Sequence, residues 1–522
     1  MKTKFMLTAL LASALVVASC DKEYLDTTPT SSTDVSTLFK STDEAKLAVN
    51  GIAKLMSKQY LGSQGLNGEG TVKMYNGNYQ GNHFSVNLSG WAVIINSTYH
   101  NNLTSIYCYY MWYYYYRIIG NANTVIANID DAEGPEGEKQ YIKAQALSYR
   151  AYAFTMLAQL YCLRWSDSKN GAELGLILRV TPTDDEMPRA TLLETYQQIY
   201  ADLNEAIGLF KSSKLHREDN SEENYVIDVE AAYAIYARAA LNRQDYSKAI
   251  EMAALAREGY PLMSVAEYNS GFASPTSEWI WSVWGSADET IYFYSYFAYI
   301  GYNSTASTVR SYPRCISKEL FDKIPDTDVR KDLFLDLADY SDPAYSYSTS
   351  TGQANAAWQT AVRGEGKIAS NANAYVYMQF KIKAEDQPGV GHLNLFRTSE
   401  MYLIEAEAKY FNSDPTGAQQ ALVALNKDSH RNDSYTCTLT GADLLDEIKT
   451  YRALELWGEG FDWFDAKRWG DPIARKSFAD GGNFISSLAV TIQPEEKNRW
   501  VWFIPSREVD YNKLAQQNNY DN

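Results

Sequence analysis

The chain has 522 residues, of which 45% are hydrophobic and 21% charged, so it can bury a core of ordinary size and is not globally disordered. Lysine and arginine number 47 against 64 aspartate and glutamate residues, which gives a formal net charge of −17. This balance excludes phosphate-driven nucleic-acid binding and adsorption to anionic lipid as default functions. The 41 tyrosines suit a partly wet binding surface, because each ring joins an apolar face to a hydroxyl.

Residues 1–19 are predicted to be a secretion signal. A basic start is followed by an uncharged, mostly apolar run over residues 5–18, shorter than the roughly 20 apolar residues that span a bilayer. The run ends in Val17-Ala18-Ser19-Cys20, which resembles a bacterial lipobox. We therefore expect a lipid anchor on Cys20 and a flexible tether over residues 20–36. Ordinary secretion with a chance cysteine is the alternative.

Four further cysteines are spread along the chain. Cys108, Cys162, Cys315 and Cys437 form no CxxC motif and show no metal-ligand spacing. A disulfide framework is typical of short chains, so we expect buried free thiols, although spacing alone leaves any pairing open.

Two long stretches have the period of amphipathic helices. Apolar residues recur at steps of four and three over residues 138–163 and again over residues 192–210. Thr191 precedes Glu194 by three residues, the spacing of a capping box, so the second helix is predicted to begin here.

Two later stretches resemble tetratricopeptide repeats in their spacing. Residues 229–261 place small and aromatic residues on two helical stripes, with a turn at residues 242–245 and Pro261 after the second stripe. Residues 398–426 repeat the pattern more weakly, with a break at Ser413-Asp414-Pro415. Such helical pairs stack to bury a shared face, so we expect them to form a continuous layer.

Two windows lack a helical period and are rich in aromatic residues. These windows, residues 62–97 and 264–394, are predicted to form long loops with short strands at residues 279–284 and 375–380. The tyrosine-rich run over residues 107–116 leads into a helical segment, so we assign it to helix packing. The sequence therefore predicts a mainly α fold, in which a tetratricopeptide-like helical-pair scaffold carries a loop-rich, short-strand ligand-binding module.

Several segments along the whole chain match one family pattern. From the N-terminus they are Ser41-Thr42-Asp43-Glu44-Ala45 with Asn50-Gly51, Ile118 to Asn123, Pro188-Arg189-Ala190-Thr191 with Tyr196, Ile199, Asp202 and Leu203, Arg452-Ala453-Leu454-Glu455-Leu456 with Glu459-Gly460, Trp463-Phe464-Asp465 and Arg468-Trp469-Gly470, and Ile504 to Asp510 with Asn519-Tyr520. On these segments the chain resembles the SusD/RagB family of outer-membrane nutrient-binding lipoproteins. It departs from the family pattern at Tyr451, Asp462 and Ala466.

The strongest of these segments is predicted to be structural. Its charged residues are Arg452, Glu455, Glu459, Asp465 and Arg468. Arg452 with Glu455, and Asp465 with Arg468, are three residues apart, so each pair can share one helix face. Buried charges persist only when paired, so we expect a fixed polar network here rather than a catalytic pair of carboxylates.

The resemblance implies a domain organisation and partners. It implies one SusD-like domain over residues 37–522, with the helical scaffold at about 37–60, 100–262 and 395–470 and the loop-rich module at about 61–99 and 263–394. It implies a lipoprotein at the outer membrane, facing the cell surface, that passes a glycan or comparable nutrient to a SusC-like TonB-dependent transporter. Neither a nucleic acid nor a cofactor is implied.

In the family the ligand site lies in the loops after the first helix and in the irregular middle region. Sugar rings stack their C–H faces on aromatic side chains, so we predict Tyr79, Trp91, Trp284 and Trp358 as stacking platforms. Asn82, His83 and Asn96 are predicted to bind sugar hydroxyls, and Tyr75 and Tyr302 complete the candidate set. About half of the aromatic candidates are expected to be core residues instead.

The sequence offers little support for catalysis. It contains no GxSxG, HExxH, Walker A or dinucleotide-binding motif. The acidic pairs at residues 130–131 and 326–328 lack the full EF-hand pattern and are interpreted as solvated loop acids rather than a metal site. The alternatives to glycan capture are capture of a peptide or another non-glycan nutrient, a secreted glycoside hydrolase, and a pure protein–protein scaffold.

Overall fold

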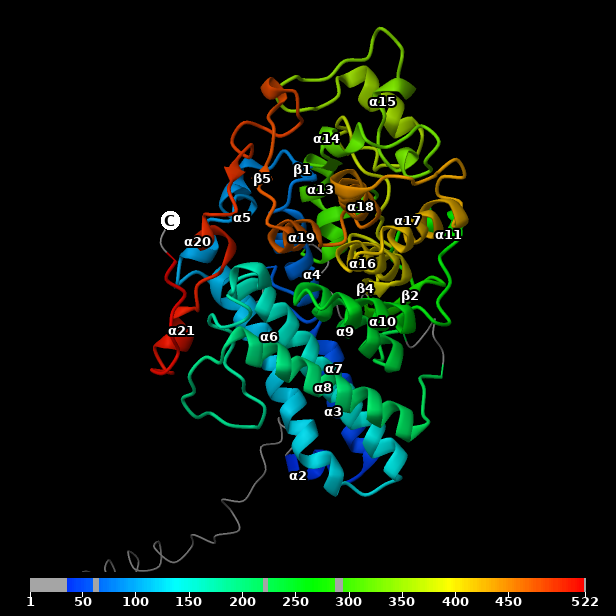
Figure 1. Cartoon of the computed structure of the whole chain (residues 1–522). Helices are drawn as coiled ribbons and strands as arrows, with labels where there is room; N and C mark the ends of the chain where they lie inside the picture. Colours follow the sequence, from blue (N-terminus) through cyan, green and yellow to red (C-terminus); the bar gives the residue numbers. More distant parts are fainter. Residues whose placement is uncertain (1–34, 60–64, 219–223, 287–293, 521–522) are drawn as a thin grey trace, which may run out of the picture.

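A computed structural model of the chain describes residues 35–59, 65–218, 224–286 and 294–520. The predicted signal peptide, Cys20 and all but the last two residues of the predicted tether lie outside these residues. The fold is mainly helical with a few short strands, as predicted (Figure 1). None of the helices in the described part is long and apolar enough to cross a membrane.

Long helices form one end of the molecule, drawn in blue, cyan and green at the lower part of Figure 1. They are α3 (Thr42–Leu55), α6 (Ile106–Asn128), α7 (Glu136–Tyr161) and α8 (Leu192–Ser213), and the short α2 (Val35–Leu38) precedes α3. α7 and α8 cover the two predicted amphipathic stretches. The predicted capping box is present: Glu194 N donates to Thr191 Oγ1 over 3.1 Å, and Thr191 N donates to Glu194 Oε2 over 2.8 Å.

The tyrosine-rich run packs as predicted for most of its length. Tyr110, Tyr114 and Tyr115 on α6 are buried, and the last two donate their hydroxyls to the buried Glu69 carboxylate. Tyr152 on α7 donates to the same carboxylate over 2.8 Å. Part of the tyrosine excess therefore serves the core, where the hydroxyls of Tyr114, Tyr115 and Tyr152 share the Glu69 carboxylate.

Two helical pairs stack above these helices. They are α9 (Val229–Asn242) with α10 (Tyr246–Ala256), and α16 (Thr398–Phe411) with α17 (Pro415–Val423). α10 packs against α16, so the pairs form the predicted continuous layer. α10 ends five residues before Pro261, next to Gly259, whose φ of +83° helical residues do not adopt. After the predicted break, the N-terminus of α17 is capped by Asp414, whose side chain accepts a hydrogen bond from Gly417 N over 2.9 Å.

The first loop-rich window contains a helix that its sequence does not indicate. α4 (Glu69–Thr71) continues into η2 (Val72–Asn78), a segment of π-helix, and every residue of both is buried. The prediction of loop for this part was wrong because the helix is buried on all sides. It therefore has no polar face to create an amphipathic period.

Short strands pair as three separate antiparallel ribbons. β1 (Phe84–Val86) pairs with β3 (Arg314–Ile316), β2 (Trp279–Val283) with β4 (Leu393–Arg397), and β5 (Ile473–Ala474) with β6 (Thr491–Ile492). Trp279 and Trp281 on β2 are both buried. The strand predicted over residues 375–380 is wrong: only isolated bridges form there, because Tyr377 turns the chain with a φ of +62°.

The remaining elements, most of them short, connect these parts. They are η3 (Ser89–Trp91), α5 (Ala92–Ile95), η4 (Tyr99–Asn101), η5 (Ile129–Asp131), η6 (Trp165–Asp167), α11 (Val265–Tyr268), α12 (Tyr296–Ile300), α13 (Ser307–Ser311), α14 (Lys318–Phe321), η7 (Lys331–Leu333), η8 (Leu337–Asp339), α15 (Ala356–Gly364), η9 (Ala424–Asp428), α18 (Gly441–Glu455), α19 (Asp462–Trp469), η10 (Phe478–Asp480), α20 (Lys497–Trp500) and α21 (Ser506–Val509). Cys108, Cys162, Cys315 and Cys437 are all free thiols, and the first three are buried.

A buried network of charges joins the helical layer to the loop-rich module. Glu455, at the end of α18, forms ion pairs with Arg330 and Arg397 at 2.8 Å and with Arg431 at 3.2 Å. Burial alone would raise the pKa of the Glu455 carboxyl, but the arginines around it hold that pKa well below its usual value. Glu459 is bound at 2.7 Å by Arg397 and by Lys381.

The ion pairs of this region differ in part from the predicted ones. Asp465 and Arg468 lie 2.9 Å apart on α19, as their spacing indicated. Arg452 does not pair with Glu455; its Nε lies 2.7 Å from Asp465 of α19 instead. Arg468 also binds the buried Glu407 of α16.

Candidate functional site

Aromatic rings from both loop-rich windows meet around Trp91. The ring centroid of Trp91 lies 5.4 Å from that of Tyr75 and 5.6 Å from that of Tyr299. Tyr107 adjoins Tyr75 at 6.1 Å and stacks on Tyr99 at 5.0 Å. We call Tyr75, Tyr79, Trp91, Tyr99, Tyr107 and Tyr299 the Trp91 cluster.

The rings of this cluster differ in burial. Tyr75 and Tyr299 are buried, and Tyr75 donates its hydroxyl to that of Tyr299 over 3.2 Å. Burial holds the pKa of the Tyr75 hydroxyl well above its usual value, so the hydroxyl is neutral. Trp91, which packs on both, and Tyr107, which packs on Tyr75, are only partly buried. The partly exposed rings can therefore contact a ligand while the buried rings support them.

Local structure fixes each ring. Trp91 ends η3 and caps α5, while Tyr107 lies in the first turn of α6, whose Ser105 cap accepts a hydrogen bond from Tyr107 N. Tyr299 lies on α12, which is capped by Ser295. Tyr294, which is 36% exposed, extends this aromatic surface beside Tyr299 across Gly65.

The η2 helix beneath the cluster is joined directly to the charged network. Asn78 donates to Gly458 O over 2.7 Å and accepts from Gly460 N over 2.9 Å. Lys73 Nζ donates to Glu459 O over 2.7 Å. A Cβ at Gly77 would stand 2.1 Å from Gly460 O, so this close backbone contact requires glycine at position 77. The backbone that carries Tyr75 is therefore fixed on both sides.

The structure separates the other predicted aromatic platforms from this cluster. Trp284 follows β2, is 41% exposed and contacts Tyr225 and His392. Trp358 lies on α15, at the opposite end from α2 in Figure 1, and is buried against three tyrosines, the nearest being Tyr340 at 5.3 Å. Within this structure its ring offers no free face to a ligand.

Two further predicted aromatic residues are placed as follows. Tyr302 is partly buried and packs edge-on against Phe380 at 5.6 Å. Tyr79 is fully buried beneath the cluster, 6.3 Å from Trp91 and 5.7 Å from Phe84. Its ring supports Trp91 rather than presenting a surface of its own.

The predicted hydroxyl-binding residues are engaged with protein atoms. Asn82 donates to Pro472 O over 3.0 Å and accepts from Ala474 N over 2.7 Å. Asn96 donates to Ser487 O over 3.0 Å and accepts from Arg475 Nη1 over 3.2 Å. Both amides therefore tie loops to the C-terminal segment.

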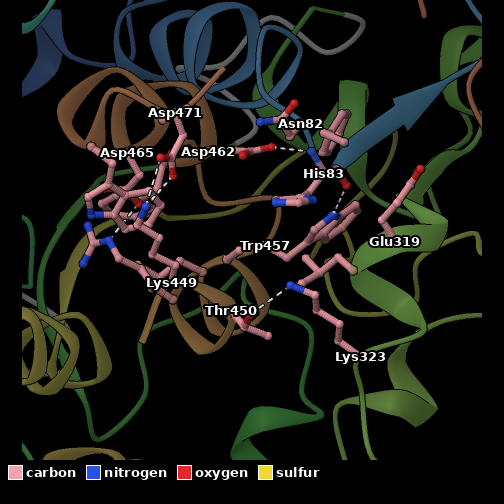
Figure 2. Close-up of a pocket in the computed structure, with 18 of the residues that line it drawn as sticks. Asn82, His83, Glu319, Lys323, Lys449, Thr450, Trp457, Asp462, Asp465 and Asp471 are labelled. Atoms are coloured by element: carbon pink, nitrogen blue, oxygen red, sulfur yellow. Dashed lines mark hydrogen bonds and ion pairs between the residues drawn. The ribbon is translucent and has the colours of Figure 1, made fainter. Parts of the chain in front are cut away.

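His83 lies instead at a separate pocket of about 330 Å³, shown in Figure 2. Its N–H donates to Asp462 over 2.6 Å, and its carbonyl accepts from Trp457 Nε1 over 2.7 Å. The pocket lies between the Asn82–Phe84 segment, α14, α18 and α19. The sequence predicted Asn82 and His83 as ligand-binding residues and Arg452 and Asp465 as parts of a structural network, but it did not anticipate a pocket that they line together.

The described ranges contain no group of three or more His, Cys, Asp or Glu residues that could hold a metal ion. Of the acids in the 326–328 segment, Asp328 is buried and bound at 2.6 Å by Arg330. Asp326 is exposed and pairs with Lys331. Asp328 is therefore a network residue rather than the solvated loop acid predicted.

Two family profiles match the chain. One, described as "Starch-binding associating with outer membrane" (SusD-like), matches residues 23–241, and one described as the SusD family (SusD_RagB) matches residues 267–520. Together they cover most of the sequence. The chain belongs to the SusD/RagB family, whose members are carbohydrate-binding proteins associated with the outer membrane.

Solved structures show the same fold. A SusD-like carbohydrate-binding protein from Bacteroides vulgatus ATCC 8482 is 24% identical with a TM-score of 0.71, over 91% of this chain and 98% of that chain. A SusD superfamily protein from Bacteroides thetaiotaomicron VPI-5482 is 23% identical with a TM-score of 0.72, over 92% and 100% of the two chains. A second B. vulgatus ATCC 8482 protein of that superfamily has 22% identity and a TM-score of 0.72, over 93% and 100%. No curated protein matches the chain.

Proposed function

We propose that this chain captures oligosaccharides on the surface of the Trp91 cluster. The observation that carries the proposal is the partly buried Trp91 ring, which packs on the buried rings of Tyr75 and Tyr299. A sugar ring presents C–H groups on one face, and an indole or phenol ring provides an apolar plane of matching size. Tyrosine hydroxyls at the edge bind sugar hydroxyls without requiring a charge.

The proposal includes a location and a partner. Lipid attachment at Cys20 would hold the protein on the outer membrane, facing the cell surface, and a SusC-like TonB-dependent transporter would receive the glycan. The lipobox-like sequence and family membership support this part. The 37–522 segment would act as a single domain, since the charged network joins the helical layer to the loop-rich module.

We further propose that capture involves no catalysis. Glycosidases use a carboxylic acid with a raised pKa facing a second carboxylate across the sugar. Glu455 and Glu459, the acids of the strongest family motif, are buried and their pKa values are lowered by the arginines and lysine around them despite their burial. Neither can serve as a general acid near neutral pH.

Calorimetry of the chain from Asp21 onward, against oligosaccharides and peptides, tests the proposal. We expect saturable binding to one class of glycan that is lost in Trp91→Ala. Tyr511→Ala is the matched control, because Tyr511 is 82% exposed and lies outside the cluster. Binding of peptides alone would favour the non-glycan alternative, release of sugar products would favour a hydrolase, and glycan binding unchanged in Trp91→Ala would refute the assigned surface.

A further inference from the structure

Three residues that line the pocket in Figure 2 carry a buried polar atom without a partner in the protein. Arg452 is 2% exposed, and its Nη1 has no hydrogen-bond partner although its Nε is bound to Asp465. Trp469 Nε1 and Glu319 Oε1, which belong to residues on other walls of the pocket, are likewise buried without a partner. Unsatisfied buried groups are costly, so three of them around one pocket indicate a ligand that supplies the missing hydrogen bonds.

The three atoms differ in the kind of hydrogen bond they require. Arg452 and Trp469 can only donate, whereas a carboxylate oxygen such as Glu319 Oε1 accepts. A matching ligand must therefore both accept and donate hydrogen bonds within a small volume. Hydroxyl groups do both, which makes a polyhydroxylated ligand the simplest match.

The charges of the pocket exclude an anionic ligand. Three cationic side chains face five carboxylates: Lys323, Lys449 and Arg452 against Glu319, Asp446, Asp462, Asp465 and Asp471. Lys449 is already paired with Asp471 at 2.7 Å. Figure 2 shows Glu319 and Lys323 on one side of the pocket and Lys449, Asp465 and Asp471 on the other. A uronate or phosphate would meet an excess of like charge.

The shape of the pocket limits the size of the ligand. Its volume of about 330 Å³ is at the lower end of the range of about 300–1,000 Å³ for small-molecule sites. Arg452 and Trp457 are buried at its base, whereas Lys323 and Asp446 are exposed at its rim. The buried Phe84 ring stacks on Trp457 at 5.1 Å and contacts Tyr79 at 5.7 Å, and so stands between this pocket and the Trp91 cluster.

We infer that this pocket is a second binding site, for a neutral saccharide of about one or two rings. The inference rests on the proposed function only for the class of ligand. The site itself is built from other residues: Arg452, Trp469 and Glu319 provide the hydrogen bonds, and Trp457 provides an apolar wall.

Binding of short sugars tests the inference. Saturation-transfer NMR and calorimetry would use glucose, galactose, mannose, maltose and cellobiose, with glucuronate as the anionic probe and the chain from Asp21 onward as the protein. We expect one neutral sugar to bind and glucuronate not to bind. Glu319→Ala should weaken this binding about tenfold, since it removes one hydrogen bond to a charged group. Ala453→Phe, which places a ring in the pocket, should abolish it.

Matched variants separate this site from the Trp91 cluster. Asp443→Ala removes an exposed carboxylate from α18 outside the pocket and should leave short-sugar binding unchanged. Trp91→Ala should also leave it unchanged while removing oligosaccharide binding. If Ala453→Phe does not fold, the weaker short-sugar binding expected of Glu319→Ala still tests the inference.

Three results would overturn the inference: no neutral short sugar binds, glucuronate binds better than the neutral sugars, or binding is the same in Glu319→Ala. Oligosaccharide binding that persists at Trp91 in any of these cases would leave the proposed function standing. If the protein binds short sugars at the pocket but binds no oligosaccharide at the Trp91 cluster, the inference would stand and the proposed function would fail.

Discussion

The charged network around Glu455 and the Trp91 cluster are both assembled from distant parts of the chain, yet they use their side chains in opposite ways. Around Glu455 the charges are buried and paired, so the side chains hold the protein together. Around Trp91 the partly exposed rings pack on buried ones. A substitution in the network should therefore change folding, and one at the cluster surface should change binding.

The largest expected effect is in the network. Glu455→Gln leaves Arg330, Arg397 and Arg431 buried without their shared counter-charge, so we expect a loss of about 3–5 kcal/mol in the free energy of unfolding. Chemical denaturation measures this loss. Lys318→Ala, which removes an exposed ion pair with Asp322, should cost less than about 1 kcal/mol. Equal losses in the two variants would contradict the role of the network.

The same carboxylate predicts a dependence on pH. Because the pKa of Glu455 is lower in the folded than in the unfolded protein, its contribution to stability is fully present above the ordinary value of 4.5. It is lost as pH falls through the lowered folded pKa. The difference in unfolding free energy between the wild type and Glu455→Gln should therefore shrink below about pH 4.5. A constant difference down to pH 3 would show that Glu455 is not the titrating group.

Trp358 tests whether burial or residue type decides the role of an aromatic side chain. Trp358→Ala should cost about 3 kcal/mol of stability, because the buried ring packs against Tyr340 and Tyr345 and its loss leaves a cavity. Oligosaccharide affinity per folded molecule should stay the same. Thermal unfolding and calorimetry measure the two quantities, and a loss of affinity without a loss of stability would move the binding surface to α15.

Trp91→Ala should show the reverse. We expect a loss of about 2 kcal/mol in binding free energy, or roughly thirtyfold in Kd, since a central aromatic anchor is removed. The loss of stability should be smaller than in Trp358→Ala because Trp91 is only partly buried. Trp91→Phe should retain part of the affinity. A larger change in stability than in binding would assign Trp91 to the core.

The smallest effect concerns the scaffold that carries both regions. Thr191→Ala removes the capping-box hydroxyl at the start of α8 and should cost about 1 kcal/mol of stability, with no change in sugar binding. Thr191→Asn, which can still cap the helix, should restore most of the loss. Equal destabilisation by alanine and asparagine would show that the cap is not the cause.

The helical parts were predictable because their signals are local. The stripes of α7 and α8, the capping box and the break before α17 each lie within a few residues of one another. The α4–η2 segment was not predictable from a period, since it is buried on all sides. The family resemblance, by contrast, depended on motifs spread from Ser41 to Tyr520.

The candidate site was predictable only in part, because burial is decided by contacts between distant segments. Trp91 and Tyr75 were predicted because the family resemblance places the ligand site in the loops after the first helix, and Tyr299 lies in the second of the two aromatic-rich windows. Tyr107 was assigned to helix packing, since nothing local shows that the first turn of α6 faces the loops. Nothing near Asn82 in the sequence indicates a partner for its amide, which is bound by residues some 390 positions away.

The contact between Gly77 and Gly460 has a consequence for affinity. It holds η2 against the turn that follows Glu455, so the Tyr75 ring is oriented before any ligand arrives. A preorganised surface loses little conformational entropy on binding, and weak stacking contacts then suffice for capture. The charged network therefore favours the binding of an uncharged ligand at the Trp91 cluster, because it helps to fix the backbone that carries Tyr75.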